Sequence, residues 1–234
     1  MLTVLCATLG DESGQPKRLP RGMQFLGPVE LRLSTAKPWA TAANELLDYA
    51  AAKGGPALFL DDDIELTRHS FDWLMSLSAT AAPDVAGFTL CNGDQIVSAG
   101  FAASVQTDDM VLLQPMQLPY ILQPFRCAHV TASCMWLSER ALQRLRFPVW
   151  PGQHHEDVAF TLEAWLQGLT VAYVPGLVFH HIDMQHMAGA TKAKDPQFAA
   201  DRAVNAWHLR EWIRERGVAQ ALRDGRIPVG VEPL

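Results

Sequence analysis

The chain has 234 residues, of which 49% are hydrophobic and 19% are charged, and its formal net charge is −6. This composition is typical of a globular protein with a sizeable core and excludes a disordered chain. The negative charge argues against a nucleic-acid partner, while a nucleotide ligand stays compatible if a divalent metal screens its phosphates. The four cysteines lack CxxC spacing, so we expect reduced, mostly buried thiols in a cytosolic protein.

The first half of the chain predicts strands that alternate with helices. We expect strands over residues 2–9, 29–34, 57–60, 85–90 and 95–102, and helices over 38–53 and 70–78. The Asn92-Gly93 dipeptide predicts a hairpin between the last two of these strands. The strand–helix–strand order indicates a parallel α/β sheet, whose ligands bind outside the carboxyl ends of the strands.

The second half begins with a segment rich in proline, residues 102–125, which we expect to be a loop. After it we expect strands over 129–137 and 170–183, helices over 138–147 and in the second half of 153–169, and an amphipathic helical tail over about 195–226. No run approaches the ~18 apolar residues of a membrane helix, and the first residues lack the basic flank of a signal peptide. We therefore expect a soluble, cytoplasmic protein, and peripheral contact with the inner face of the membrane stays open.

Three consecutive aspartates, Asp61, Asp62 and Asp63, follow the apolar run ALFL. Adjacent carboxylates repel one another and Asp is a poor strand former, which favours a bound cation at this position. Alternate residues of a strand point the same way, so Asp61 and Asp63 can reach one Mg²⁺ or Mn²⁺ while Asp62 turns away. The alternative is a solvated acidic loop that caps the next helix.

Two further clusters stand at the ends of predicted elements. In His154-His155-Glu156-Asp157, which precedes a helix, Asp157 is either a helix cap or a carboxylate held at the helix start as a general base. His180-His181 ends the last strand, where a histidine is either structural or completes a mixed nitrogen and oxygen site suited to Mn²⁺.

Four segments in this order resemble the GT-A glycosyltransferases of the family 2 type, which include rhamnosyl- and galactofuranosyltransferases. They are ALFLDDDIEL, NGDQIVSAG, TASCMWLSERAL and HHEDVAFTLEAWLQGLTVAYVPGLVFHH, and the resemblance covers roughly residues 36–183. It implies an α/β, GT-A-like single domain over residues 1–190, with a mostly parallel central sheet flanked by helices. Residues 1–100 would hold the nucleotide-sugar and the metal, residues 101–190 the acceptor, and residues 191–234 would form a helical tail packed on the domain. The N-terminus is shortened, because fewer strand–helix units precede Asn44 than the family usually has.

The resemblance also implies roles for single residues. Asp157, the second residue of the Glu-Asp pair, matches the catalytic base. Asp61, Asp63 and His180 match the ligands of a Mn²⁺ or Mg²⁺ cofactor, with His181 as the alternative to His180. The expected donor contacts are Asp61, Asp62 and Asn44, and the expected acceptor contacts are Trp136, Trp150 and Glu156. Either tryptophan is alternatively a core residue.

The implied function is that of a metal-dependent inverting glycosyltransferase. It would move a sugar from a nucleotide-sugar donor to a hydroxyl of a carbohydrate or lipid-linked acceptor, as in the synthesis of surface polysaccharides or glycolipids. Three alternatives stay open. One is a nucleotidyltransferase, although LGDESGQPKR is a poor version of its Gly-rich basic loop. Another is a phosphatase of the haloacid dehalogenase type, which usually has Thr or Val where Glu65 stands. The third is a non-catalytic nucleotide- or carbohydrate-binding descendant of a transferase, which would bind a nucleotide-sugar without turning it over.

Overall fold

The computed structural model describes residues 2–8, 19–22, 30–35, 38–66, 83–92, 95–98, 100–108, 110–115, 124–151, 154–181, 196–230 and 232–234. The predicted helix over 70–78 and the predicted Asn-Gly turn lie wholly or partly outside these residues.

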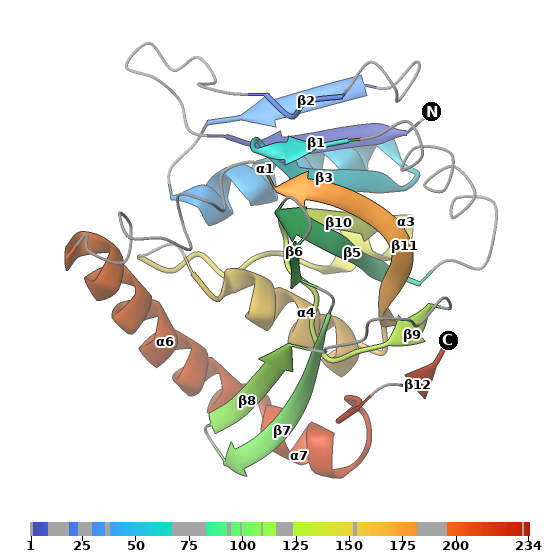
Figure 1. The fold of residues 1–234 in the computed structure, drawn as a ribbon. Coiled ribbons are helices and arrows are strands. Elements are labelled where there is room, and N and C mark those ends of the chain that lie inside the picture. The colour runs from blue at the N-terminus through green and yellow to red at the C-terminus, as the bar shows by residue number, and fades with distance from the viewer. Residues whose placement is uncertain are drawn as a thin grey trace.

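A mixed β-sheet forms the centre of the molecule (Figure 1). Its strands follow the order β12-β9-β11-β5-β10-β3-β1-β2, with β4 paired to β11 and β6 paired to β5. The strands of this sheet are β1 (Thr3–Ala7), β2 (Glu30–Ser34), β3 (Ala57–Asp61), β4 (Ile64–Glu65), β5 (Val85–Asn92), β6 (Gln95–Ser98), β9 (Phe125–Arg126), β10 (Cys134–Leu137), β11 (Val171–His181) and β12 (Glu232–Pro233).

The central strands point the same way, with one exception. Strands β2 and β3 run parallel to β1, and β11 runs parallel to β5. Strand β10 lies between β3 and β5 and is antiparallel to both. It is shorter than the predicted strand over 129–137, because the chain before Cys134 forms a loop. The predicted fold class, α/β with a mostly parallel central sheet flanked by helices, is confirmed.

The central strands are buried on both faces, which explains why the ALFL run is continuously apolar. Ala57 and Phe59 of β3 pack on the side that is covered by the helices, whereas Leu58 and Leu60 pack on the other side. The covering helices are α1 (Trp39–Lys53), α3 (Glu139–Arg144) and α4 (Glu156–Leu166). All four cysteines are buried free thiols, in agreement with the prediction.

A separate hairpin corrects the expected loop over residues 102–125. Strands β7 (Phe101–Thr107) and β8 (Met110–Pro115) pair antiparallel. Val111 and Leu113 alternate with more exposed residues and pack on a buried cluster, and this period of two identifies a half-buried strand. The proline at the end of β8 terminates the strand instead of disrupting it. The predicted strand over 95–102 is likewise divided into β6 and β7, next to Gly100, whose φ is 78°.

The C-terminal tail contains two helices where one was expected, α6 (Pro196–Arg216) and α7 (Val218–Arg223). Gly217, with φ of 65°, separates them, because glycine adopts this left-handed conformation without steric cost. Ile213 and Leu222 of the tail pack against Leu162 of α4 in a shared apolar cluster. Figure 1 shows α6 running past α4 toward the hairpin. None of the described helices is long and apolar enough to cross a membrane.

Candidate active site

Polar residues gather where the parallel strands β1, β2 and β3 end. Ala7 pairs with Ser34 on one side and with Asp61 on the other, so these three strands end at the same level. Thr8 directly follows β1, and its main-chain N–H donates to the Ser34 carbonyl at 3.1 Å. The carboxyl ends of parallel strands form the edge where α/β sheets bind ligands, and the aspartate triplet lies at this edge, as predicted.

The carboxylates of the triplet have different surroundings. The Asp62 carboxylate accepts a short hydrogen bond from the Thr8 hydroxyl, which ties the triplet to the end of β1. Burial, together with the charges of Asp63, Asp62 and Asp157, raises the pKa of Asp61 to about 7, although a hydrogen bond from Ser133 acts in the opposite direction. A cation bound nearby would therefore favour the ionised form of the Asp61 carboxyl group.

The loop between β9 and β10 connects the triplet to the start of α4. The main-chain N–H of Asp61 donates to the Ser133 carbonyl at 2.9 Å. The next residue back along the loop, Ala132, directs its N–H toward Asp157 Oδ2 at 3.5 Å. Val130 of the same loop lies on Gly87 of β5 so closely that a Cβ at Gly87 would be 2.3 Å from the Cβ of Val130. Asp61 and Asp157, which are distant in sequence, are thus hydrogen-bonded to adjacent residues of one loop.

Asp157 is the second residue of α4, where main-chain N–H groups are exposed and the helix dipole favours a negative charge. Its Oδ1 accepts from the N–H of Val158 at 2.9 Å, and its side chain is 26% exposed. His155, the N-cap of the helix, has a φ of 70° and makes no side-chain cap hydrogen bond. A non-glycine residue in this left-handed conformation carries backbone strain, which proteins commonly keep at functional sites. Asp157 therefore combines a helix-start position with access to solvent.

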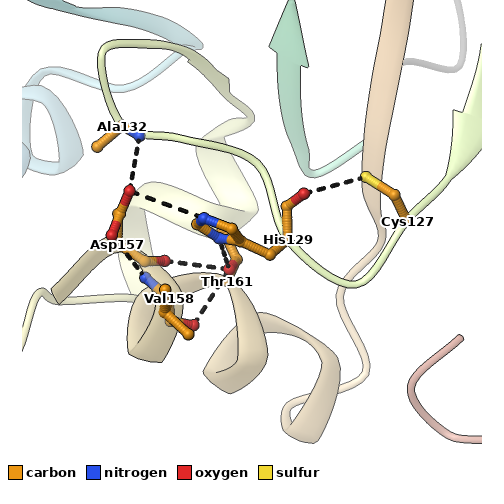
Figure 2. Close-up of polar contacts among 6 residues, drawn as sticks. All are labelled: Cys127, His129, Ala132, Asp157, Val158 and Thr161. Atoms are coloured by element: carbon orange, nitrogen blue, oxygen red, sulfur yellow. Dashed lines mark hydrogen bonds and ion pairs between the residues drawn. The ribbon is translucent and has the colours of Figure 1, made fainter. Parts of the chain in front are cut away.

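Sequence reasoning missed a buried histidine behind Asp157. His129 is 3% exposed, and its Nε2 lies 3.8 Å from Asp157 Oδ2 (Figure 2). Its Nδ1 lies 2.8 Å from the hydroxyl of Thr161, one turn further along α4. Burial lowers the pKa of His129, although the charge of Asp157 acts in the opposite direction. The only sequence signal is a histidine in an apolar stretch, and this stretch predicts a strand over 129–137.

The structure corrects the predicted acceptor contact of Glu156. This side chain is 4% exposed and accepts a hydrogen bond from Asn205 of α6 at 3.3 Å. The Asn205 amide also donates to the His154 carbonyl at 2.9 Å, so α6 holds the start of α4 in place. Burial raises the pKa of Glu156 to about 7. A side chain turned into the protein in this way offers a sugar no surface.

The tryptophans predicted to contact the acceptor differ in exposure. Trp136, in the middle of β10, is 2% exposed and packs with Leu58 and Leu60, which corrects its prediction to a core residue. Trp150 is half-buried and stacks on the ring of His208 of α6, with 6.0 Å between the ring centroids. Its acceptor contact stays a prediction.

Asn44, predicted to contact the donor, holds two parts of the fold together. From α1 its amide donates to the Phe147 carbonyl and accepts from the Phe147 N–H, both at 2.8 Å. Both ends of the amide are therefore used by the main chain beyond α3. Binding of a donor by this side chain would require these hydrogen bonds to break.

The backbone shows where the segments of the predicted metal site lie. His180 pairs with Glu65 and with Cys91, and His181 pairs with Ile64, so the end of β11 lies beside the segment that directly follows the triplet. The histidine side chains lie outside what the structure describes. Among the described side chains, no group of three or more His, Cys, Asp or Glu residues is arranged to hold a metal ion. The ligand set Asp61, Asp63 and His180 stays a prediction.

Comparisons with known proteins give structural likenesses at low sequence identity. No protein-family model matches the sequence, and no curated protein matches it. The structure is similar to that of A197 from STIV, with a TM-score of 0.48, 14% identity, and coverage of 74% of this chain and 81% of the other. GalNAc-T7, crystallised with UDP, GalNAc and Mn²⁺, gives a TM-score of 0.49 and 14% identity, over 77% of this chain and 43% of the other. Residues 1–349 of S. aureus TarS give a TM-score of 0.45 and 13% identity, over 96% of this chain and 73% of the other. All three TM-scores are below 0.5, so the assignment of a function rests on the site itself.

Proposed function

We propose that this protein is a glycosyltransferase that moves a sugar from a nucleotide-sugar donor to an acceptor hydroxyl with inversion. The proposal depends on one observation above all. Asp61, at the carboxyl end of β3, and Asp157, at the start of α4, hydrogen-bond to adjacent residues of one loop, and the charge of Asp157 contributes to the raised pKa of Asp61. The sequence resemblance to family 2 transferases assigns the metal to the first position and the base to the second.

The two carboxylates suit different tasks. Asp61 and Asp63, with His180, would hold Mn²⁺ or Mg²⁺, which when bound supplies positive charge for the diphosphate leaving group. Asp157 is partly exposed and held by the helix N–H groups, so it is positioned to accept a proton. Asp62 is fixed by Thr8 and would contact the donor from the side of β1.

The proposed reaction is a single displacement at the anomeric carbon. The acceptor oxygen attacks this carbon while its proton passes to Asp157, and the bond from the anomeric carbon to the diphosphate oxygen breaks on the opposite face. One displacement inverts the configuration. The products are the glycosylated acceptor, the nucleoside diphosphate and one proton held by the protein. The expected acceptor is a carbohydrate or a lipid-linked saccharide.

A panel of nucleotide-sugars, with simple saccharide acceptors and Mn²⁺, tests the proposal. We expect the full chain to release nucleoside diphosphate and to form a product of inverted configuration. Asp157→Asn keeps the shape of the side chain but accepts protons poorly. It should slow transfer by roughly 10²–10⁴-fold, the range for loss of a general base, and leave donor affinity within a few-fold.

Three outcomes would contradict the proposal. Transfer at the wild-type rate by Asp157→Asn would return Asp157 to the role of a helix cap. Binding of nucleotide-sugars without release of nucleoside diphosphate for any donor would identify a non-catalytic binding protein. Release of diphosphate, in place of nucleoside diphosphate, from nucleoside triphosphates and sugar phosphates would identify a nucleotidyltransferase.

A further inference from the structure

We propose that His129 is a positioning residue that acts through Asp157 and receives the proton that Asp157 takes from the acceptor. This inference rests on the proposed function, because it assigns a partner to the proposed base. It is carried by the contacts in Figure 2, in which one ring nitrogen of the histidine meets the Thr161 hydroxyl and the other lies toward the Asp157 carboxylate.

The Thr161 hydroxyl connects His129 to the main chain of α4. This hydroxyl has one proton, and the main-chain carbonyls of Asp157 at 3.0 Å and of Val158 at 3.2 Å lie within its reach. In the proposed arrangement the proton is given to a carbonyl, and the imidazole N–H at Nδ1 donates to the hydroxyl oxygen at 2.8 Å. In a neutral ring the other nitrogen, Nε2, therefore presents its lone pair.

Nε2 faces the carboxylate of Asp157 and is separated from water. Its distance of 3.8 Å from Asp157 Oδ2 exceeds that of a hydrogen bond and is compatible with the lone pair that the proposal places on Nε2. His129 is 3% exposed, and its ring packs beside the ring of Phe101 with 4.9 Å between centroids. Among the described residues, the charged or titratable groups that act on it are Asp157 and His155. Burial keeps the imidazole neutral until a proton arrives from Asp157.

The proton balance then closes during transfer. The acceptor O–H bond breaks, and its proton binds Asp157 Oδ2 as the new glycosidic bond forms. That proton passes to Nε2, which gives an imidazolium beside a restored carboxylate, and the gap closes by about 1 Å to a charge-assisted hydrogen bond. The proton leaves to water after the nucleoside diphosphate departs, and the neutral pair is restored. The proton is thus kept away from the product oxygen while the products are still bound.

Matched variants separate this role from a structural one. His129→Asn keeps an N–H near Thr161 and removes Nε2, while Thr161→Val removes the group that fixes the tautomer and Thr161→Ser keeps it. We expect His129→Asn and Thr161→Val to lower the maximal transfer rate roughly 10-fold, with the donor KM within about twofold. In both variants the acid limb of the pH–rate profile should move to lower pH, because a carboxylate then titrates without the imidazole. Thr161→Ser should retain the wild-type profile.

Nitrogen-15 NMR of the histidine rings in the full chain supplies a readout that needs no activity. At neutral pH we expect the signal that is lost in His129→Asn to show a protonated Nδ1 and an unprotonated Nε2. The inference is overturned if Nε2 carries the hydrogen, or if the pH–rate profile of His129→Asn has the wild-type shape at a lower amplitude. If NMR shows the expected tautomer but the protein transfers no sugar, the proposed function is overturned while the arrangement of His129 and Asp157 is confirmed.

Discussion

Replacement of Asn44 by alanine decides between the role predicted from the sequence and the role seen in the structure. The sequence resemblance places Asn44 at the donor, whereas the structure shows both ends of its amide bonded to the Phe147 main chain at 2.8 Å. Phe147 is 2% exposed and stacks on Phe160 with 4.2 Å between ring centroids. The two hydrogen bonds therefore hold α1 against a packed aromatic cluster.

The expected cost follows from these contacts. Asn44→Ala removes two hydrogen bonds and leaves a main-chain donor and acceptor of a buried residue without partners. Each hydrogen bond contributes about 1 kcal/mol, and each unpaired buried group costs about 1–3 kcal/mol where water cannot replace the partner. Because Asn44 is half-buried, we expect water to recover part of this loss. The free energy of unfolding should fall by about 2–4 kcal/mol, which lowers Tm by roughly 5–10 °C in a chain of this length.

Urea unfolding followed by tryptophan fluorescence measures the loss, and calorimetric titration measures binding of the nucleotide-sugar that the panel identifies. Glu45→Ala is the matched control, because Glu45 is the next residue of α1, is exposed, and accepts a surface hydrogen bond from the Ser34 hydroxyl. Its stability should stay within about 0.5 kcal/mol of wild type. Wild-type stability in Asn44→Ala together with a tenfold or greater loss of donor affinity would refute the structural role and restore the predicted donor contact.

Three further predictions address pH, packing and metal. The pKa of Glu156 is raised from 4.5 to about 7, so its neutral form stabilises the fold fully below about pH 4.5, and this contribution is lost as pH rises through 7. Glu156→Gln should therefore reduce the fall in Tm that wild type shows between pH 5 and 8. An unchanged dependence of Tm on pH in this variant would contradict the raised pKa of Glu156. Gly87→Ala should lower the free energy of unfolding by about 1–3 kcal/mol, since the added Cβ would meet the Val130 side chain at 2.3 Å, and wild-type stability in urea would show that the loop yields freely. Mn²⁺ must displace the proton from Asp61, whose pKa is about 7, so calorimetry should show that Mn²⁺ affinity falls and proton release rises from pH 8 to 6. Asp63→Ala should weaken Mn²⁺ binding at every pH. A Mn²⁺ affinity that does not depend on pH would exclude Asp61 as a ligand.

The sequence by itself was sufficient for the parts of this protein that depend on local pattern. The continuous apolar run ALFL predicted a strand of the central sheet, and Asp61 lies at the carboxyl end of that strand, as expected. Glu156 and Asp157 were expected at the start of a helix, and α4 begins there. Such features can be predicted because the period of two or of 3.6 residues, the caps and the charge near a terminus are set by residues close in the chain.

Only the tertiary structure decided which residues meet. Strand β10 enters antiparallel between β3 and β5, and the loop before it joins Asp61 to Asp157 and buries His129 behind the carboxylate. No local pattern encodes this, because the partner of a buried strand is chosen by shape and hydrogen bonding over the whole sheet. For the same reason the structure decided that Trp136 is the core residue that the sequence had left as an alternative, and that Glu156 is buried. Whether a large or charged side chain faces a ligand or the core depends on what packs over it. Trp136 is covered by the apolar cluster that contains Leu58 and Leu60, and Glu156 is covered by α6, which contributes Asn205.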